Sequence, residues 1–178
     1  MAANANCPIP GSIDPLTSNG FMFNISKLPN VSYFCQEANL PEITLGSTFQ
    51  ATPFVDLSTP GDKLAFGDLS IQFMVDSKMA NYTAIHDWLF ALGFPQDNQQ
   101  FTDFVNQDTR NTRNEAMRTV SDAVLSILGP LNTPVRTVQF RDLYPLSLSS
   151  IIFRSTNTDV QYIVGNATFK YAYYEFTE

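Results

Sequence analysis

The sequence predicts a mainly β fold, namely an antiparallel β-sandwich or barrel with one flanking α-helix and long loops. Three observations predict it: a strict two-residue alternation over residues 69–75, a single stretch of helical spacing over 82–92, and strand-like segments over 119–175. The chain has 178 residues, of which 44% are hydrophobic and 13% aromatic, so it can bury one substantial core. Charged residues make up only 15%, which excludes a chain that is mainly disordered.

Residues 1–20 are predicted to form an N-terminal arm, and residues 21–178 a single β domain. Asn, Pro, Gly and Ser are frequent in the arm, so it is either a disordered terminus or an extension that becomes ordered against a neighbouring molecule. The arm has no Lys or Arg and is broken by prolines, which excludes a signal peptide and a transit peptide. We therefore expect a protein made and kept in a cytoplasm, with reduced cysteines.

Two strands are expected to open the β domain. Alternation over residues 21–28 predicts the first strand, and the Pro29-Asn30 pair that follows is a turn signal. Alternation over residues 31–38 predicts the second strand, and the chain is expected to continue in an extended form over 42–45.

A long loop with one short strand is predicted for residues 46–60, which contain Pro53, Pro60 and several Thr and Ser residues. A structureless stretch of this length is uncommon in a compact monomer and often has a binding role. We therefore expect this loop to have a binding role. The candidate contact residues are Thr48, Phe49, Phe54, Val55, Asp56 and Leu57.

The next two elements have the clearest patterns. A half-buried strand is predicted over residues 69–75, where apolar and other residues alternate. An amphipathic helix follows, with Asn81 as its N-cap and a stop at Gly93, and it is expected to be the only long helix. The predicted sheet core comprises Leu69, Ile71, Phe73 and Val75, and the predicted core face of the helix comprises Ile85, Trp88 and Leu89.

A polar insertion and a hairpin come next. Residues 95–115 are rich in Gln, Asn and Asp and are predicted to form an exposed insertion loop, either without regular structure or with one helical turn. Residues 119–128 and 135–140 then predict an antiparallel hairpin, whose second segment is expected to end at Pro145.

A second strand pair is predicted at the C-terminal end, from residues 150–154 and 160–175, with a bulge at Gly165-Asn166. The edges of such a sheet are either covered by loops of the same chain or completed by pairing with another chain. The pattern alone leaves both alternatives open.

The sequence offers little for catalysis. His86 is the only histidine, Cys7 and Cys35 form no CxxC pair, and no glycine-rich phosphate loop occurs. The acidic residues at 97–108 lack the spacing of a calcium loop. We therefore predict no enzymatic activity, no cofactor and no metal site. An enzyme built on this chain would have to work through carboxylates and would tolerate substitution of His86.

The charge of the chain limits its partners. The formal net charge is −7, which argues against wrapping nucleic acid through phosphate neutralisation. No apolar run reaches the roughly eighteen residues that a membrane helix needs. Residues 1–108 carry eleven acids and three bases, whereas residues 109–178 carry six acids and seven bases. This asymmetry is either chance or a sign that opposite faces differ in charge, as in a self-stacking subunit.

The order of these features resembles the tail tube proteins of contractile-tailed phages, a family related to the inner tubes of type VI secretion and contractile injection systems. The resemblance extends over residues 21–176. It rests on Phe34-Cys35-Gln36, Asn39-Leu40-Pro41, Pro60-Gly61-Asp62-Lys63, the strand 69–75, Asp87-Trp88, the turn Asp142-Leu143-Tyr144-Pro145 and the closing strand with Phe169, Tyr171 and Tyr173.

The resemblance implies a structural virion protein of the phage tail, assembled in the host cytoplasm. Members of this family form hexameric rings that stack into a tube, whose acidic lumen conducts DNA without binding it specifically. Sheath and baseplate proteins are the implied partners. Residues 1–20 and 95–115 exceed what a minimal tube subunit needs, which implies specialised contacts.

Two alternatives remain at this stage. A tube-initiator or hub ring of the baseplate has the same implied fold and differs only in its place in the particle. A cytosolic β-sandwich adaptor or ligand-binding domain belongs to a different class of protein and would stay monomeric.

Overall fold

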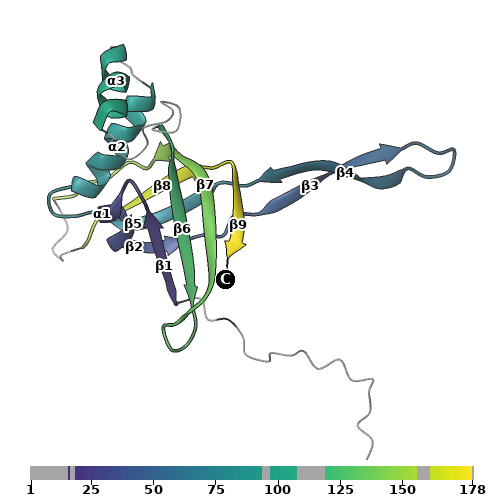
Figure 1. Ribbon diagram of the computed structural model, residues 1–178, viewed down its shortest axis with the longest axis horizontal. Coiled ribbons are helices and arrows are strands. Elements are labelled where there is room, and N and C mark those ends of the chain that lie inside the picture. The colour runs from purple at the N-terminus through teal and green to yellow at the C-terminus, as the bar shows by residue number, and fades with distance from the viewer. Residues whose placement is uncertain (1–15, 17–18, 94–96, 108–118, 156–160, 178) are drawn as a thin grey trace, which may run out of the picture.

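The computed structural model describes residues 16, 19–93, 97–107, 119–155 and 161–177 (Figure 1). Most of the predicted N-terminal arm lies outside these residues. The described part of the chain contains nine strands and three α-helices. The strands are all antiparallel to their neighbours, which confirms the predicted mainly β, antiparallel fold class.

The body consists of two sheets that share one long strand. One sheet has the order β1-β6-β7-β9 and the other the order β7-β8-β5-β2. The strands are β1 (Phe21–Ile25), β2 (Cys35–Ala38), β5 (Leu69–Met74), β6 (Ser121–Leu128), β7 (Pro134–Leu148), β8 (Val164–Lys170) and β9 (Tyr173–Thr177). The two remaining strands, β3 and β4, pair only with each other and leave the body as a separate hairpin.

The shared strand β7 bends between the two sheets. Its first half pairs with β6 and β9, and its second half pairs with β8. Between the halves, Asp142 has a φ of 55°, a left-handed conformation that Asp tolerates better than most residues. The predicted end of this strand at Pro145 is wrong, because β7 continues to Leu148. Among the described strands the second half of β7 pairs only with β8, so a residue without an N–H is tolerated there.

The core lies between the facing sides of the two sheets. In β5 the alternation places Leu69, Ile71 and Phe73 fully inside, whereas Val75 lies just beyond the strand and is partly buried. The opposite sheet contributes apolar side chains at the same two-residue spacing. These are Phe23 and Ile25 of β1, Ala123 and Leu125 of β6, and Val138 and Phe140 of β7.

Helix α2 (Ala80–Gly93) packs onto this core through one face. Ile85 and Trp88 are fully buried and Leu89 is partly buried. The indole N–H of Trp88 donates a hydrogen bond to the Thr119 carbonyl at 2.9 Å. Asn81 is not the N-cap but lies inside the first turn, where its Nδ2 donates to the Met74 carbonyl at 2.7 Å. The buried Asn81 side chain therefore fixes the helix to the end of β5.

Two further helices occupy segments where the sequence predicts a turn and a strand in one case and a loop with at most one helical turn in the other. Helix α1 (Pro29–Tyr33) replaces the predicted turn and the start of the predicted second strand. A proline at the first helical position is compatible with a helix start, and Val31 is buried against the core. Helix α3 (Asn98–Gln107) lies in the predicted insertion loop. Its Val105 is buried, and Lys27 lies over the ring of Phe104, 4.9 Å from its centroid.

The C-terminal strand pair differs from its prediction. Residues 150–154 contain no strand, and residues 156–160 lie outside the described part of the chain. The predicted closing strand is divided into β8 and β9 at Ala172, whose N–H donates to the Arg141 carbonyl at 2.9 Å. No bulge occurs at Gly165 in its pairing with β5. A Cβ at Gly165 would come within 3.0 Å of the Phe73 ring, so the cross-strand ring occupies that space.

The burial of Phe73 leads to a stability prediction. We expect Phe73→Ala to lower the free energy of unfolding by about 3–5 kcal/mol, because it removes a fully buried ring and leaves a cavity. Gln72→Ala, on the outer side of the same strand, should change it by less than about 0.5 kcal/mol. Denaturant unfolding of both variants measures the difference. Equal effects would contradict the inward orientation of Phe73.

Candidate assembly interface

Strands β3 (Ile43–Gln50) and β4 (Leu57–Phe66) form a long hairpin that projects from the body (Figure 1). We call residues 43–66 the long hairpin. The prediction that residues 46–60 form a loop with one short strand is therefore wrong. A strand that is exposed on both faces needs no alternation of apolar and polar residues, so the pattern that reveals strands in a core is absent here.

The long hairpin exposes many large apolar side chains. All eight residues of β3 are exposed, and Phe54 at the tip is 99% exposed. A two-stranded hairpin buries little by itself, and exposed apolar side chains in such number mark an interaction surface. The exposed large apolar residues are Ile43, Leu45, Phe49, Phe54, Val55, Leu57 and Leu64.

All six predicted contact residues lie in the outer half of the long hairpin. Thr48 and Phe49 are on β3, Leu57 begins β4, and Phe54, Val55 and Asp56 lie in the connection between the strands. The structure brings them together at the tip, although no partner chain is present to show their contacts. A local turn shapes this tip, because the Val55 N–H donates to Thr52 Oγ1 at 3.3 Å and the Thr52 hydroxyl donates to the Val55 carbonyl.

A pair of glycines permits a change of register halfway along the hairpin. Leu45 pairs with Leu64, but Ser47 pairs with Pro60, so β4 contains two extra residues at this point. A Cβ on Gly61 would lie 2.6 Å from the Gly46 carbonyl oxygen, which no side chain can tolerate without movement of the backbone. The close approach of the two strands therefore requires glycine at Gly61.

Aromatic rings hold the base of the long hairpin against the body. Phe66 ends β4, and its ring centroid lies 5.8 Å from that of Tyr174 and 6.1 Å from that of Tyr171. Both tyrosines also contact Phe140, at 5.6 Å and 5.1 Å. These edge-to-face and tilted geometries are favourable for aromatic pairs. We call Phe66, Phe140, Tyr171 and Tyr174 the base cluster.

Hydrogen bonds add a second attachment at the hairpin base. The hydroxyl of Tyr174 donates to the Pro41 carbonyl at 3.1 Å, just before β3. The Gly67 N–H, just after β4, donates to the Glu42 carbonyl at 2.9 Å. Burial raises the pKa of Tyr171 to about 12, so its hydroxyl stays neutral in the base cluster at physiological pH. Both strands of the long hairpin are therefore anchored where they leave the body.

The two sheets also end in strands with an open edge. Among the described strands, β1 pairs only with β6, β2 only with β5, and β9 only with β7. Backbone N–H and C=O groups on such edges can pair with a strand of another chain. The structure thus combines a projecting apolar hairpin with open sheet edges, which is an arrangement for assembly rather than for catalysis.

Similarity to a known protein family identifies the class of protein that has this fold. The sequence profile of a family described as phage tail tube protein matches residues 8–177. The chain belongs to the phage tail tube protein family. This confirms the resemblance seen in the sequence, and it makes the chain a structural protein rather than an enzyme. A comparison with curated proteins gives no match.

Solved structures share the fold of this tail tube protein at low sequence identity. The tube-terminating cap of the anti-feeding prophage is 14% identical and has a TM-score of 0.59, with 99% of each chain covered. A sheath–tube complex of an extracellular contractile injection system in its extended state is 13% identical, with a TM-score of 0.55 and coverage of 92% of this chain and 91% of that one. The anti-feeding prophage baseplate is 15% identical, with a TM-score of 0.57 and coverage of 92% and 96%.

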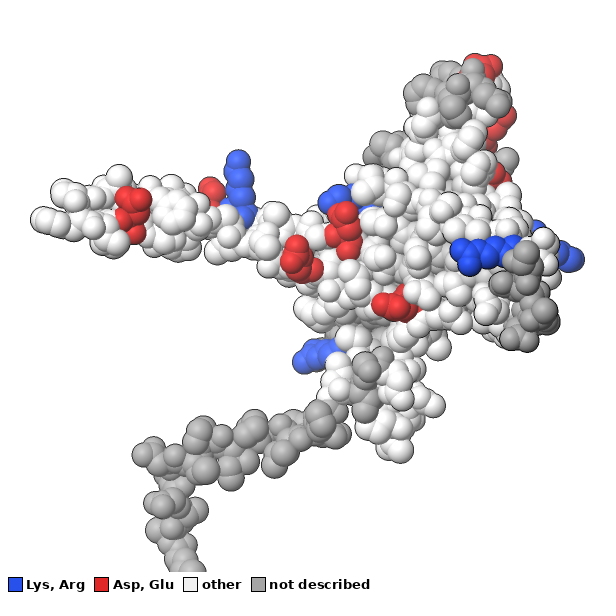
Figure 2. Space-filling model, turned by 180° about the vertical axis from the view of Figure 1, so that it is seen from behind, with Lys and Arg blue, Asp and Glu red and all other residues white. Residues whose placement is uncertain are grey.

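Charged side chains on the tail tube protein form pairs on the outer faces of its sheets. On the β1-β6-β7-β9 sheet, Arg141 donates to Asp122 and Glu175, each at 3.2 Å. The hydrogen bond to Glu175 and the nearby charge of Asp122 raise the pKa of Arg141. On the other sheet Lys170 pairs with Asp68. Figure 2 shows acidic and basic groups interspersed over an otherwise uncharged surface, so no single-sign patch covers this face.

Reactive side chains show no catalytic arrangement in the described residues. His86 contacts the neighbouring Asp87 at 3.2 Å on the helix surface and stacks on Phe90. Burial raises the pKa of the Cys35 thiol to about 11, so it stays protonated at neutral pH. No cluster of three or more metal-ligating side chains occurs there, and no described helix is long and apolar enough to cross a membrane.

The hydrogen bond at the hairpin base can be tested alone. Tyr174→Phe keeps the ring in the base cluster but removes the bond to the Pro41 carbonyl, which is worth about 0.5–1.5 kcal/mol. We expect faster exchange of the Gly67 amide, which donates to the Glu42 carbonyl, and little change at the core strands. Tyr173→Phe, the exposed neighbour in β9, is the matched control. If both variants behave alike, Tyr174 does not anchor the hairpin.

Proposed function

We propose that this chain is the subunit of a phage tail tube, in which hexameric rings stack and DNA passes through an acidic lumen during ejection. The observation that carries the proposal is the long hairpin of a tail tube family member. Its tip exposes apolar side chains, including Phe49, Phe54 and Val55. Exposed apolar surface of this kind is typical of a protein–protein interface. In a tube, the six predicted residues at the tip contact a neighbouring subunit or ring.

Ring formation is supported by the open sheet edges. Six copies join by adding an edge strand of one subunit to an edge strand of the next, so that sheets continue around the ring. Backbone hydrogen bonds then replace the water that covers these edges in the monomer. A closed barrel is stable for the same reason, since closure leaves no edge unpaired.

The outer face of the β7-β8-β5-β2 sheet has the chemistry that a DNA channel needs. At its centre, β5 and β8 present uncharged polar side chains, namely Ser70, Gln72, Asn166 and Thr168. Lys170 is paired with Asp68, and Glu37 of β2 lies beside Gln72. A wall with a paired cation and a slight negative excess repels a polyanion weakly, so DNA slides without adhering. We propose that this face lines the lumen.

The proposed protein partners are those that adjoin a tube in a tailed particle. The similar solved structures come from a sheath–tube complex, a baseplate and a tube cap. We propose that this chain likewise contacts sheath and baseplate proteins in a virion that is assembled in the host cytoplasm. Residues 1–20 and the insertion 95–115 are our candidates for contacts beyond those of a minimal tube subunit.

A baseplate ring is the second candidate function. The likeness to the anti-feeding prophage baseplate structure favours it as much as the likeness to the sheath–tube complex favours the main tube. An initiator or hub ring would use the same sheet edges but would not elongate by itself.

Negative-stain electron microscopy of the purified chain, with its mass in solution, tests the proposed function. We expect long hollow tubes with six-fold symmetry in cross-section. Isolated rings that never elongate would support the baseplate ring instead. A monomer of 19.9 kDa at all concentrations, even with a nucleating ring added, would contradict both and favour an adaptor domain.

The lumen assignment needs a separate experiment with two matched cysteine variants. Ser70→Cys lies on the proposed lumen face and Ser126→Cys on the outer face of the other sheet. In assembled tubes, a maleimide polymer too large to enter the lumen should label Ser126→Cys much faster than Ser70→Cys. Unassembled subunits should be labelled at both positions, after subtraction of the label on the parent chain. Fast labelling of Ser70→Cys in tubes would refute the assignment.

A further inference from the structure

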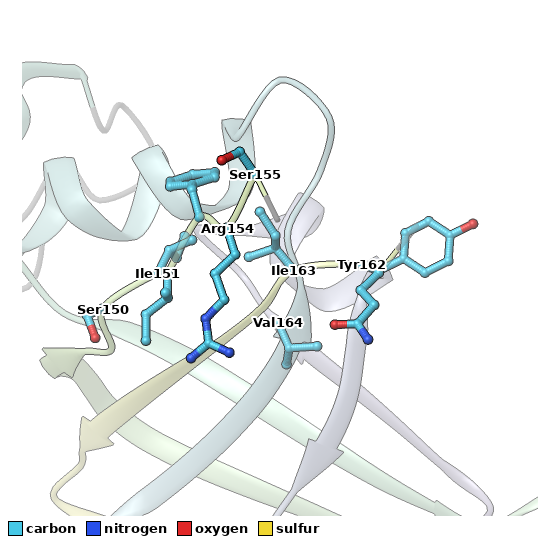
Figure 3. Close-up of a pocket in the computed structure, with 10 residues that line it drawn as sticks. Ser150, Ile151, Arg154, Ser155, Tyr162, Ile163 and Val164 are labelled. Carbon is cyan, nitrogen blue, oxygen red and sulfur yellow. The ribbon is translucent and has the colours of Figure 1, made fainter. Parts of the chain in front are cut away.

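The body has an open hollow at the end remote from the long hairpin. It has a volume of about 840 Å³ and lies between two segments, residues 150–155 and 161–164 (Figure 3). Pockets that enclose compact groups have volumes of about 300–1,000 Å³. Its rim is apolar, since Ile152, Phe153 and Tyr162 are 68%, 69% and 77% exposed.

The lining of this hollow combines apolar side chains with the polar residues Ser150, Ser155 and Gln161 and with one charged residue, Arg154. Figure 3 shows Arg154 extending between the two segments, with Ile151 on one side and Ile163 and Val164 on the other. A guanidinium group in this position favours a partner that carries a carboxylate next to apolar side chains. A segment that carries both apolar side chains and an acidic residue therefore fits the chemistry of this hollow.

The tip of the long hairpin has this chemistry. Phe54 and Val55 are 99% and 62% exposed, and Asp56 follows them directly. Both the hairpin tip and the hollow expose apolar side chains, and each carries one charge of opposite sign. A tip of three residues on a narrow two-stranded stem can enter an open hollow without a rearrangement of the body.

The positions of the tip and the hollow suit a contact between copies. The long hairpin joins β5 at its Leu69 end, whereas Val164 beside the hollow pairs with Met74 at the other end of β5. The hairpin therefore leaves the body at one end (Figure 1), whereas the start of β8, which lines the hollow, lies at the other end of β5. A contact between two different surfaces of this kind is head-to-tail, and it repeats from subunit to subunit.

We propose that the hollow lined by residues 150–155 and 161–164 receives the hairpin tip of a second copy of this chain. Phe54 and Val55 enter among Ile152, Phe153 and Tyr162, and the carboxylate of Asp56 pairs with Arg154. The inference rests on the proposed function, because it names the surface that the hairpin contacts when subunits assemble. It also predicts a fixed polarity, since every subunit offers one tip and one hollow.

Charge reversal tests the pairing. Asp56→Arg and Arg154→Asp should each raise the protein concentration needed for assembly by about tenfold or more, because each places like charges together. The double variant restores the opposite charges and should assemble nearly as well as the parent. Asp62→Arg is the matched control, since Asp62 is an exposed acid on β4 away from the tip, and Arg154→Asp should not rescue it. Sedimentation of assembled material compares the parent, the three single variants and the two double variants.

A disulfide cross-link provides an independent readout. With the native Cys7 and Cys35 replaced by Ser, the variant Asp56→Cys/Arg154→Cys should form covalent multimers under oxidising conditions when assembled, whereas a chain with only one of these two cysteines should form at most a dimer. If the parent assembles but charge reversal shows no rescue and no cross-link forms, the proposed pairing is refuted while the proposed function stands. A parent chain that never assembles refutes the proposed function and the pairing together.

Discussion

The apolar surface of the long hairpin is the constraint on which the rest of the structure depends. A hairpin of two strands has no third layer to cover its side chains, so Phe49, Phe54 and Leu57 lose little contact with water when it forms. Ordering each residue costs about 1–2 kcal/mol of backbone entropy, which burial normally offsets. The described residues offer no such burial at the tip, so the proposed contact with a second copy would supply it. Under that proposal, assembly and the ordering of the hairpin are linked.

The body is built so that this hairpin leaves it in a defined direction. The bent strand β7 joins the two sheets, and β9 returns along it to place Tyr174 beneath the hairpin base. The same tyrosine contacts Phe66 and Phe140, so one C-terminal residue connects the hairpin, the shared strand and the core. A contact made by β9 at its open edge would thus act close to the hairpin base. In the proposed ring, contacts at β9 and contacts at the hairpin would therefore be coupled through the aromatic rings of the base cluster.

The sequence predicted those elements that bury one face. Strand β5 and helix α2 follow periods of two and 3.6 residues because one side of each lies against the core, and their core residues are inside as expected. The long hairpin has no buried face and therefore no period, so its backbone was predicted wrongly although its role as a contact surface was inferred from its length. The hollow beside Arg154 could not be predicted, because tertiary structure alone brings its two segments together.

Shortening the long hairpin tests the central claim most directly. Leu45 and Leu64 are paired, so replacing residues 46–63 by Asn-Gly should close a short hairpin and leave the body and the base cluster unchanged. Light scattering gives the mass of this variant beside that of the intact chain, and its thermal unfolding checks the fold. We expect a folded protein that no longer forms tubes at any concentration. Tubes of normal length from the shortened chain would contradict it.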